Sequence, residues 1–167
     1  MAEVTLDTAP VATPEGGADA ATEAPTEVRP LREPAKPDAG GYVWGTGRRK
    51  AAVARVRIRA GSGVFLIKGR EVDVYFCELR DQEDCMTPLK VTQMEGKIDV
   101  FIKTHGGGYM GQAGAVKLGL ARALIGYDPT LETILREHNL LSRDPRRVER
   151  KKYGQRGARR RFQFSKR

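Results

Sequence analysis

Cysteine, histidine and long hydrophobic runs are all scarce in this chain of 167 residues. No apolar run approaches the roughly 18–20 residues that cross a bilayer, which excludes a membrane-spanning protein. Two cysteines, Cys77 and Cys85, are too few for a disulfide framework and fit a reducing compartment. Their seven-residue gap and the lone His105 and His138 fit no usual zinc spacing. We therefore predict no metal and no cofactor, with buried or free thiols.

Positive charge is abundant but unevenly distributed. Lys and Arg number 30 against 21 Asp and Glu, a net charge of +9. Residues 1–41 hold three basic and eight acidic side chains, a net of −5, so the remaining residues carry +14. A body this basic indicates a polyanionic partner, either nucleic acid or an acidic membrane surface.

Residues 1–41 also lack aromatic side chains, and they contain six of the nine prolines. Such a segment cannot bury enough apolar surface to offset the entropy of ordering it, so we predict a disordered acidic extension. A targeting role is the alternative. A secretory signal needs a basic start and an apolar stretch, whereas a transit peptide is Arg-rich and poor in acids, and neither description fits.

Residues 42–141 show the patterns of a folded α+β domain. Residues 54–60 alternate apolar and arginine side chains, which predicts a strand. The turn at 61–63 then leads into an apolar strand at 64–67, and we expect these two strands to form a hairpin. Residues 97–103 alternate again and predict a further strand.

Helices are expected in the same domain. An apolar stripe over 72–79 predicts a short helix, and a mixed loop through Thr87 and Pro88, with a short strand near Val91, should follow. A longer helix is expected from the glycine run at 106–108 to about Leu124, ended by Gly126. Asp128 and Pro129 should cap another helix, with His138 on its apolar face.

Residues 142–167 form a basic tail with 12 Lys or Arg against two acids, a net of +10. Apolar periodicity is absent, so a solvated charge run describes the unbound tail. Tyr153, Phe162 and Phe164 are interleaved with arginines, and Arg/Gly segments of this type fold onto RNA. The excess of Arg over Lys and the lack of an amphipathic helix favour nucleic acid over a membrane.

Three local motifs bear on chemistry. Residues 106–111 fit G-x-G-x-x-G, but no second parallel strand is expected after them and no Walker lysine follows, so a nucleotide site is not favoured. Glycines at a helix start instead let backbone amides approach a phosphate, which RNA also supplies. The acidic residues in 78–84 are interpreted as a solvated loop, because no nucleophile or base is paired with them.

The strongest motif is Gly45-Thr46-Gly47-Arg48-Arg49-Lys50-Ala51-Ala52. Three cations stand between pairs of small residues, so the segment can press against a phosphate backbone. An exposed cationic loop that only enters a strand is the alternative interpretation.

Taken together, three separated motifs in order resemble the bacterial form of the small-subunit ribosomal protein nine family, over about residues 42–167. The first is the segment 45–50, and the second is the glycine run with Gly111, Gln112, Ala115, Gly119 and 121–124. The third is the tail, through Arg146, Arg147, Glu149, 151–154, 158–160 and the terminal Ser165-Lys166-Arg167. The acidic extension lies outside this resemblance.

The resemblance implies a two-layer α/β sandwich with a left-handed β-α-β crossover, like the second domain of ribosomal protein five, against the usual right-handed rule. It also implies a structural, non-enzymatic place in the head of the cytoplasmic small ribosomal subunit, on the 3′ major domain of the rRNA. The tail would reach the anticodon stem-loop of the P-site tRNA. The resemblance also implies a superfamily that includes kinases with a glycine-rich phosphate loop.

The expected partners are small-subunit rRNA, P-site tRNA and neighbouring head proteins, with no membrane and no small-molecule substrate. The candidate rRNA contacts are Arg48, Arg49, Lys50, Arg55, Arg57, Gly106, Gly107, Gly108, Gln112, Lys117, Arg143, Arg146, Arg147, Arg150, Lys151, Lys152, Arg156, Arg159, Arg160 and Arg161. The candidate tRNA contacts are Ser165, Lys166 and Arg167. Two other classes stay open from the residues alone: a small RNA-processing or phosphotransfer enzyme using the glycine loop, and a nucleic-acid chaperone acting through its tail.

Overall fold

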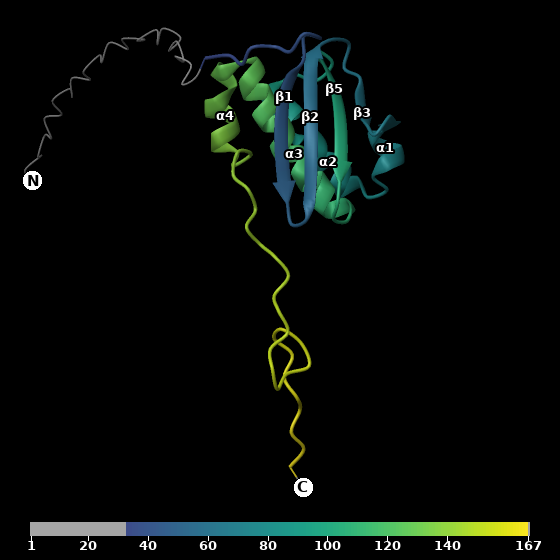
Figure 1. Ribbon diagram of the computed structural model, residues 1–167, viewed down its shortest axis with the longest axis vertical. Coiled ribbons are helices and arrows are strands. Elements are labelled where there is room, and N and C mark those ends of the chain that lie inside the picture. Colours follow the sequence, from purple (N-terminus) through teal and green to yellow (C-terminus); the bar gives the residue numbers. More distant parts are fainter. Residues whose placement is uncertain (1–32, 167) are drawn as a thin grey trace, which may run out of the picture.

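The computed structural model describes residues 33–166 (Figure 1). Most of the predicted acidic extension, residues 1–32, lies outside the described residues. The described part, 33–41, contains no helix or strand, and its Ala35 N–H donates to the Gly126 carbonyl at 2.8 Å.

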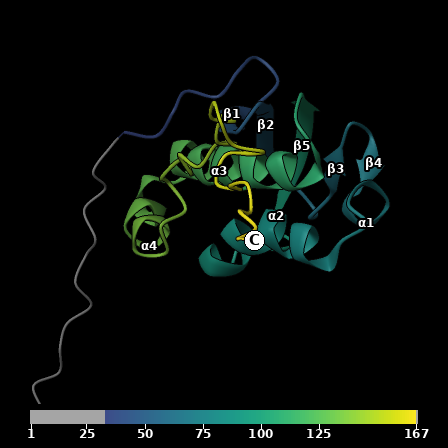
Figure 2. The ribbon, with the colours of Figure 1, turned by 90° about the horizontal axis from the view of Figure 1, so that it is seen from below.

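The body is a five-stranded mixed sheet with α2 and α3 packed on one face, which confirms the α+β class (Figures 1 and 2). The strand order is β1-β2-β5-β3-β4, and β3 runs parallel to β5 while the other neighbours are antiparallel. The strands are β1 (Val43–Arg49), β2 (Ala52–Ala60), β3 (Phe65–Ile67), β4 (Arg70–Glu71) and β5 (Ile98–His105). The helices are α1 (Val72–Tyr75), α2 (Leu79–Thr92), α3 (Tyr109–Tyr127), a 3₁₀ turn (Pro129–Leu131) and α4 (Glu132–Glu137).

The segment 45–50 folds as a strand and not as a loop. β1 and β2 form a hairpin with a two-residue turn, in which Lys50 takes a left-handed φ of 52°. Gly45 and Gly47 face α3, and a Cβ on Gly47 would lie 1.9 Å from the Ala115 carbonyl oxygen. The glycines that we expected to admit a phosphate backbone therefore admit the backbone of α3.

The expected hairpin of 54–60 with 64–67 is wrong, because β5 lies between β2 and β3. The chain crosses the end of β5 at residues 61–63, where the Asp99 carboxylate accepts from the Ser62 and Val64 backbone N–H groups at 2.9 and 3.2 Å. These hydrogen bonds, led by the one from Val64, lower the pKa of Asp99. The turn residues thus lead into a crossover and not back along β2.

The loop and short strand expected around Pro88 and Val91 are also wrong, because α2 continues through both. A proline inside a helix costs about 3 kcal/mol or more. Here Cys85 and Leu89 are buried, and the helix packs on α3, so tertiary burial outweighs the proline. The helix ends where Gln93 adopts a left-handed φ of 54°.

α3 is the central helix and begins after the glycine run as predicted. Val116, Leu120 and Leu124 are fully buried. The helix continues past Gly126 to Tyr127, and Asp128 then caps the following turn by accepting from the Thr130 N–H at 3.0 Å. His138 was expected in the core, but it is exposed because α4 ends at Glu137 and buries Leu135 instead.

Candidate nucleic-acid interface

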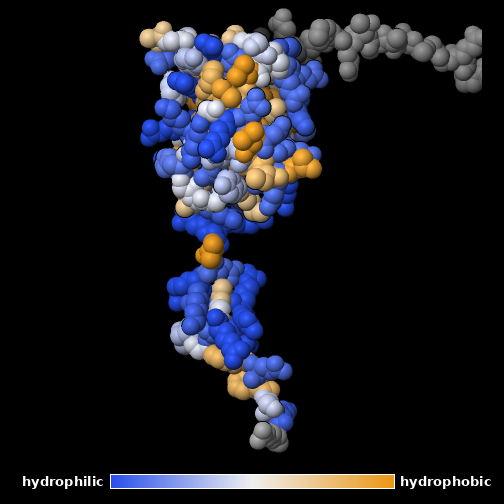
Figure 3. Space-filling view, turned by 90° about the vertical axis from the view of Figure 1, so that its right-hand side faces the viewer, coloured by the Kyte–Doolittle hydropathy of each residue, from blue (hydrophilic) through white to orange (hydrophobic). Residues whose placement is uncertain are grey.

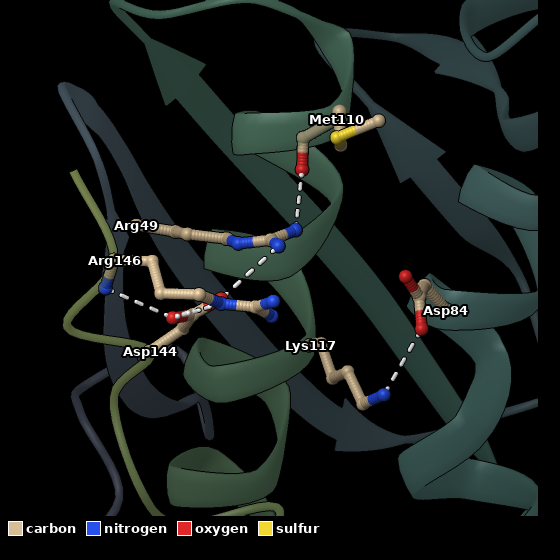
Figure 4. Close-up of polar contacts among 6 residues, drawn as sticks. All are labelled: Arg49, Asp84, Met110, Lys117, Asp144 and Arg146. Carbon is tan, nitrogen blue, oxygen red and sulfur yellow. Dashed lines mark hydrogen bonds and ion pairs between the residues drawn. The ribbon is translucent and has the colours of Figure 1, made fainter. Parts of the chain in front are cut away.

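The tail is fastened to the body by Arg49, at the end of β1 (Figure 4). One guanidinium nitrogen donates to the Met110 carbonyl oxygen at 3.1 Å, and the other to the Asp144 carboxylate at 3.1 Å. The Arg49 side chain is only 18% exposed. Arg49 therefore joins β1, the start of α3 and the tail, and its charge points into the protein.

A second cation holds Asp144 from the tail side. Arg146 donates from Nε to Oδ1 and from Nη2 to Oδ2, both at 3.0 Å, and its backbone N–H also donates to Oδ1 at 3.0 Å (Figure 4). These bonds from Arg146, followed by its charge and the bond from Arg49, hold the pKa of Asp144 well below its usual range. The carboxylate stays ionised at neutral pH and sets where the chain leaves the body. We call Arg49, Asp144 and Arg146 the tail root.

A cleft of about 280 Å³ opens beside the tail root. Lys117 reaches across it from α3, with Nζ 3.0 Å from Asp84 Oδ1 on α2 (Figure 4). Arg48 and Arg80 are exposed, and neither forms an ion pair within residues 33–166. The charged side chains lining this cationic cleft are Arg48, Arg49, Arg80, Lys117 and Arg146 with Asp84 and Asp144. Positive charge in excess around a concave surface favours phosphate groups.

The glycine run forms a tight connection between β5 and α3. Gly106 and Gly107 have φ values of 71° and 65°, and a Cβ on Gly106 would lie 2.6 Å from the Ala51 carbonyl oxygen. Gly108 precedes α3 with open space around it and without a side-chain cap, so the first amides of α3 keep their capacity for an anion.

Gln112 supports this connection from inside. Its side-chain nitrogen donates to the Gly106 carbonyl at 3.1 Å, and its oxygen accepts from the Tyr75 hydroxyl at 2.6 Å. Gln112 is 9% exposed. The structure therefore places this predicted RNA contact behind the glycine run rather than at the surface.

Arg55 and Arg57 lie apart from the cleft, on the sheet face opposite α2 and α3. Arg55 is exposed, and the Arg57 guanidinium lies 5.0 Å from the ring centre of Tyr42. The predicted cations of the body thus form two groups, one around the cationic cleft with the nearby Lys50 turn and one on the open sheet face. Arg48, which faces outward at the end of β1 and also lines the cleft, lies between the two groups.

The tail, residues 142–166, contains no helix or strand and runs away from the body (Figure 1). Within it, Arg159 Nε donates to Glu149 Oε2 at 3.0 Å, which lowers the pKa of Glu149 and closes a small loop. Arg156 lies 5.2 Å from the ring centre of Phe162. The tail surface is mainly hydrophilic with a few apolar patches (Figure 3), and Val148, Tyr153 and Phe164 are exposed. Its further exposed cations are Arg143, Arg147, Arg150, Lys151, Lys152, Arg160 and Arg161.

The tip of the tail lies far from the body (Figure 1). Ser165 and Lys166 are exposed, and Arg167 lies outside the described residues. Phe164, next to them, is 92% exposed. The described part of the tip is therefore accessible to a partner beyond the reach of the folded body.

Sequence reasoning missed three residues of these surfaces. Arg80 stands four residues before Asp84, so once α2 is recognised the helical spacing places both residues on the same face of that helix. Asp144 is one of two acids in the tail, and no pattern links it to Arg49. Trp44 lies two positions before Thr46 and four before Arg48. Strand alternation through β1 would therefore have placed the side chains of all three residues on the same outer face of the sheet.

The thiols and acidic residues are arranged as structural groups. Cys77 is exposed, whereas burial raises the pKa of the Cys85 thiol. Asp81 was expected in a solvated loop but is buried in α2, and that burial raises its pKa. Between residues 33 and 166, no three His, Cys, Asp or Glu side chains gather as a metal site.

Over the same stretch, no helix combines the length and the apolar character needed to cross a membrane.

Comparison with known proteins gives a consistent result. The family model described as "Ribosomal protein S9/S16" matches residues 47–167. The small ribosomal subunit protein uS9 of Thermotoga neapolitana is 52% identical over 130 residues, which cover 76% of this chain and 96% of that protein. The protein of the same name from Thermotoga maritima is 51% identical over the same shares. Because both the family model and these relatives span most of the chain, the protein belongs to the ribosomal protein S9/S16 family.

Proposed function

We propose that this protein, a structural ribosomal protein of the small subunit and not an enzyme, binds rRNA in the subunit head and extends its tail to the P-site tRNA. The observation that carries this proposal is the tail root. A cationic tail with no fixed attachment point could leave the body in many directions. Here Arg49 and Arg146 both bind the ionised Asp144 carboxylate and fix the point where the tail begins. The body supplies a docking surface and the tail an arm of defined direction.

The proposed mechanism is charge neutralisation. Each cation that meets a phosphate displaces condensed counterions, so RNA helices can pack more closely around the protein. In the body, the cations that would neutralise phosphates are Arg48 and Lys50, at the β1–β2 turn, and Lys117, in the cationic cleft. In the tail, the exposed arginines and lysines of 143–161 would neutralise further phosphates. Arg49 and Gln112 would act through the residues that they hold in place.

The glycine run is part of the same proposal. The uncapped start of α3 lies next to exposed Gly106, Gly107 and Gly108, where a phosphate can approach the backbone closely. Ser165, Lys166 and Arg167 would contact tRNA, because an arm anchored at its root carries them beyond the body. Neighbouring head proteins are the remaining expected partners, without a membrane or a small-molecule substrate.

We also propose a division into an extension (1–41), a globular domain (42–141) and a tail (142–167), and a left-handed crossover from β3 to β5. The parallel pairing of these strands, with α2 between them in sequence and behind the sheet, supports this hand (Figures 1 and 2).

The proposal is tested with reconstituted small subunits. Full-length protein should co-sediment with subunits after a high-salt wash, and a variant with Arg48→Gln, Lys50→Gln and Lys117→Gln should be retained less. Glu95→Gln and Lys97→Gln, exposed residues before β5, form the control for surface substitution. Equal retention of all proteins would contradict binding through the cleft and the β1–β2 turn.

A further inference from the structure

The sheet face opposite α2 and α3 carries a regular array of aromatic and cationic side chains. Register places Trp44 of β1 beside Arg57 of β2, Arg57 beside Phe101 of β5, and Phe101 beside Leu66 of β3. The next outward row contains Thr46, Arg55 and Lys103. A row with two aromatic side chains and one arginine therefore lies directly against a row with two cations.

Part of this array is already held in place. The Arg57 guanidinium lies 5.0 Å from the ring centre of Tyr42 and 5.3 Å from that of Phe101, and the two rings meet edge to face at 6.1 Å. Contacts of this type fix side chains that would otherwise lose freedom on binding. Trp44 differs, since it is 52% exposed and stacks on no ring or cation between residues 33 and 166.

Next to Trp44 the face is hollowed, with an open volume of about 510 Å³. Arg55, Lys68 and Lys103 line the hollow, and none of its lining residues is acidic. Most of the surface lining the hollow is apolar, and Trp44, Phe101 and Leu66 contribute to it, with Arg57 between Trp44 and Phe101 in the register. The hollow thus combines a flat aromatic surface with a cationic rim.

These two properties select an occupant. An acidic peptide would use the cations but has no flat group to place on an indole. A double helix offers phosphates but keeps its bases stacked inside. An unpaired nucleotide supplies both a π face and a phosphate, which is how aromatic and basic side chains bind single strands.

We infer that this sheet face is a second RNA-binding surface, separate from the cationic cleft, and that it takes an unpaired nucleotide of single-stranded RNA. The base stacks on Trp44, and the flanking phosphates lie against Arg55, Lys68 and Lys103. This inference rests on the proposed function, since it gives a named part of the body a mode of RNA binding.

Trp44 is the only tryptophan of the chain, so its fluorescence reports on this surface alone. The experiment titrates the full chain with a single-stranded oligouridylate and follows two signals, tryptophan emission and the anisotropy of a dye on the oligonucleotide. Anisotropy reports binding anywhere on the protein, including the tail. We expect the oligouridylate to quench Trp44, and a blunt RNA duplex of equal charge to bind with much less quenching.

Variants separate stacking from charge. Trp44→Leu should weaken oligouridylate binding by about 5- to 150-fold, the range for loss of one stacked base, while Trp44→Phe should restore most of it. Phe164→Leu, an exposed aromatic of the tail, is the matched control and should leave quenching of Trp44 unchanged. Because Trp44 is half exposed, both Trp44 variants should unfold at a midpoint near that of the parent, which separates a loss of RNA binding from a loss of folding.

The outcomes divide clearly. Binding seen by anisotropy without quenching of Trp44 would overturn this inference and leave the proposed function standing. Equal quenching by polyglutamate would overturn it in favour of an acidic protein partner. Absence of binding to every RNA tested would overturn both.

Discussion

The close approach of β1 to α3 makes Gly47 the position at which a single methyl group should cost most. A Cβ there would lie 1.9 Å from the Ala115 carbonyl oxygen and 2.4 Å from the Gly119 nitrogen. Ordinary contacts lie at about 3.4 Å or more, so the strand and the helix must separate by about 1.5 Å. Both obstacles are backbone atoms, and no rotamer change relieves them.

This separation would loosen the main contact between the sheet and its central helix. Overpacking of a core costs about 1–3 kcal/mol when side chains can shift, and more when backbone must move. We therefore expect Gly47→Ala to lower the free energy of unfolding by about 3–4 kcal/mol. In a domain of this size that lowers the unfolding midpoint by at least about 12 °C.

Circular dichroism during thermal and urea unfolding measures the effect. Gly108→Ala is the matched control, because Gly108 has φ of −100° and an added Cβ there would meet nothing within 4 Å. It should change stability by less than about 1 kcal/mol. If Gly47→Ala were as mild as Gly108→Ala, the close strand–helix contact could not be the reason for this glycine.

Three other predictions concern the tail and its charge. Asp144→Asn should release the tail root and broaden the angles at which the tail leaves the body, measured by spin-label distances from β2 to residue 150. Because the folded-state pKa of Asp144 is lowered, its ionised carboxylate stabilises the tail root above about pH 4, and this stabilisation is lost as pH falls below that. The same distances should therefore broaden on acidification, and an unchanged distribution would contradict the ionic anchor. RNA affinity should fall with salt at a log–log slope near −5 if about six phosphates are neutralised, and a flat response would point to stacking alone. Deleting Ser165, Lys166 and Arg167 should weaken P-site tRNA binding similarly for different tRNAs, with assembly retained, since phosphate contacts carry no sequence information; equal tRNA affinity would refute a role for the tip.

Sequence patterns correctly predicted the helices, strands and turns that are determined by residues close together in the chain. The alternation in 54–60 indicated β2, and the apolar stripe after the glycine run indicated α3. Asp128 and Pro129 marked the following turn through side-chain and ring geometry that needs no distant partner. These features depend on neighbours in sequence.

The errors arise where distant residues decide. Nothing near residues 61–63 indicates that β5, more than thirty residues later, will take the place beside β2. Pro88 is a helix breaker in isolation, and only the burial of Cys85 and Leu89 against α3 reverses that preference. The link between Arg49 and Asp144 spans 95 positions, so the tail root was invisible in sequence.

The residues of segment 45–50 and its neighbour Trp44 have two different roles, depending on which side of β1 they face. Because strand side chains alternate, Gly45, Gly47 and Arg49 face α3 and the tail root, while Trp44, Thr46 and Arg48 face outward. Three consecutive cations therefore do not act alike. Arg49→Gln should act mainly through the tail, by freeing Asp144, whereas Arg48→Gln should weaken RNA binding by the body and leave tail geometry unchanged. Measuring both properties for both variants tests this division, and matching effects of the two substitutions would show that the motif is a uniform charged patch after all.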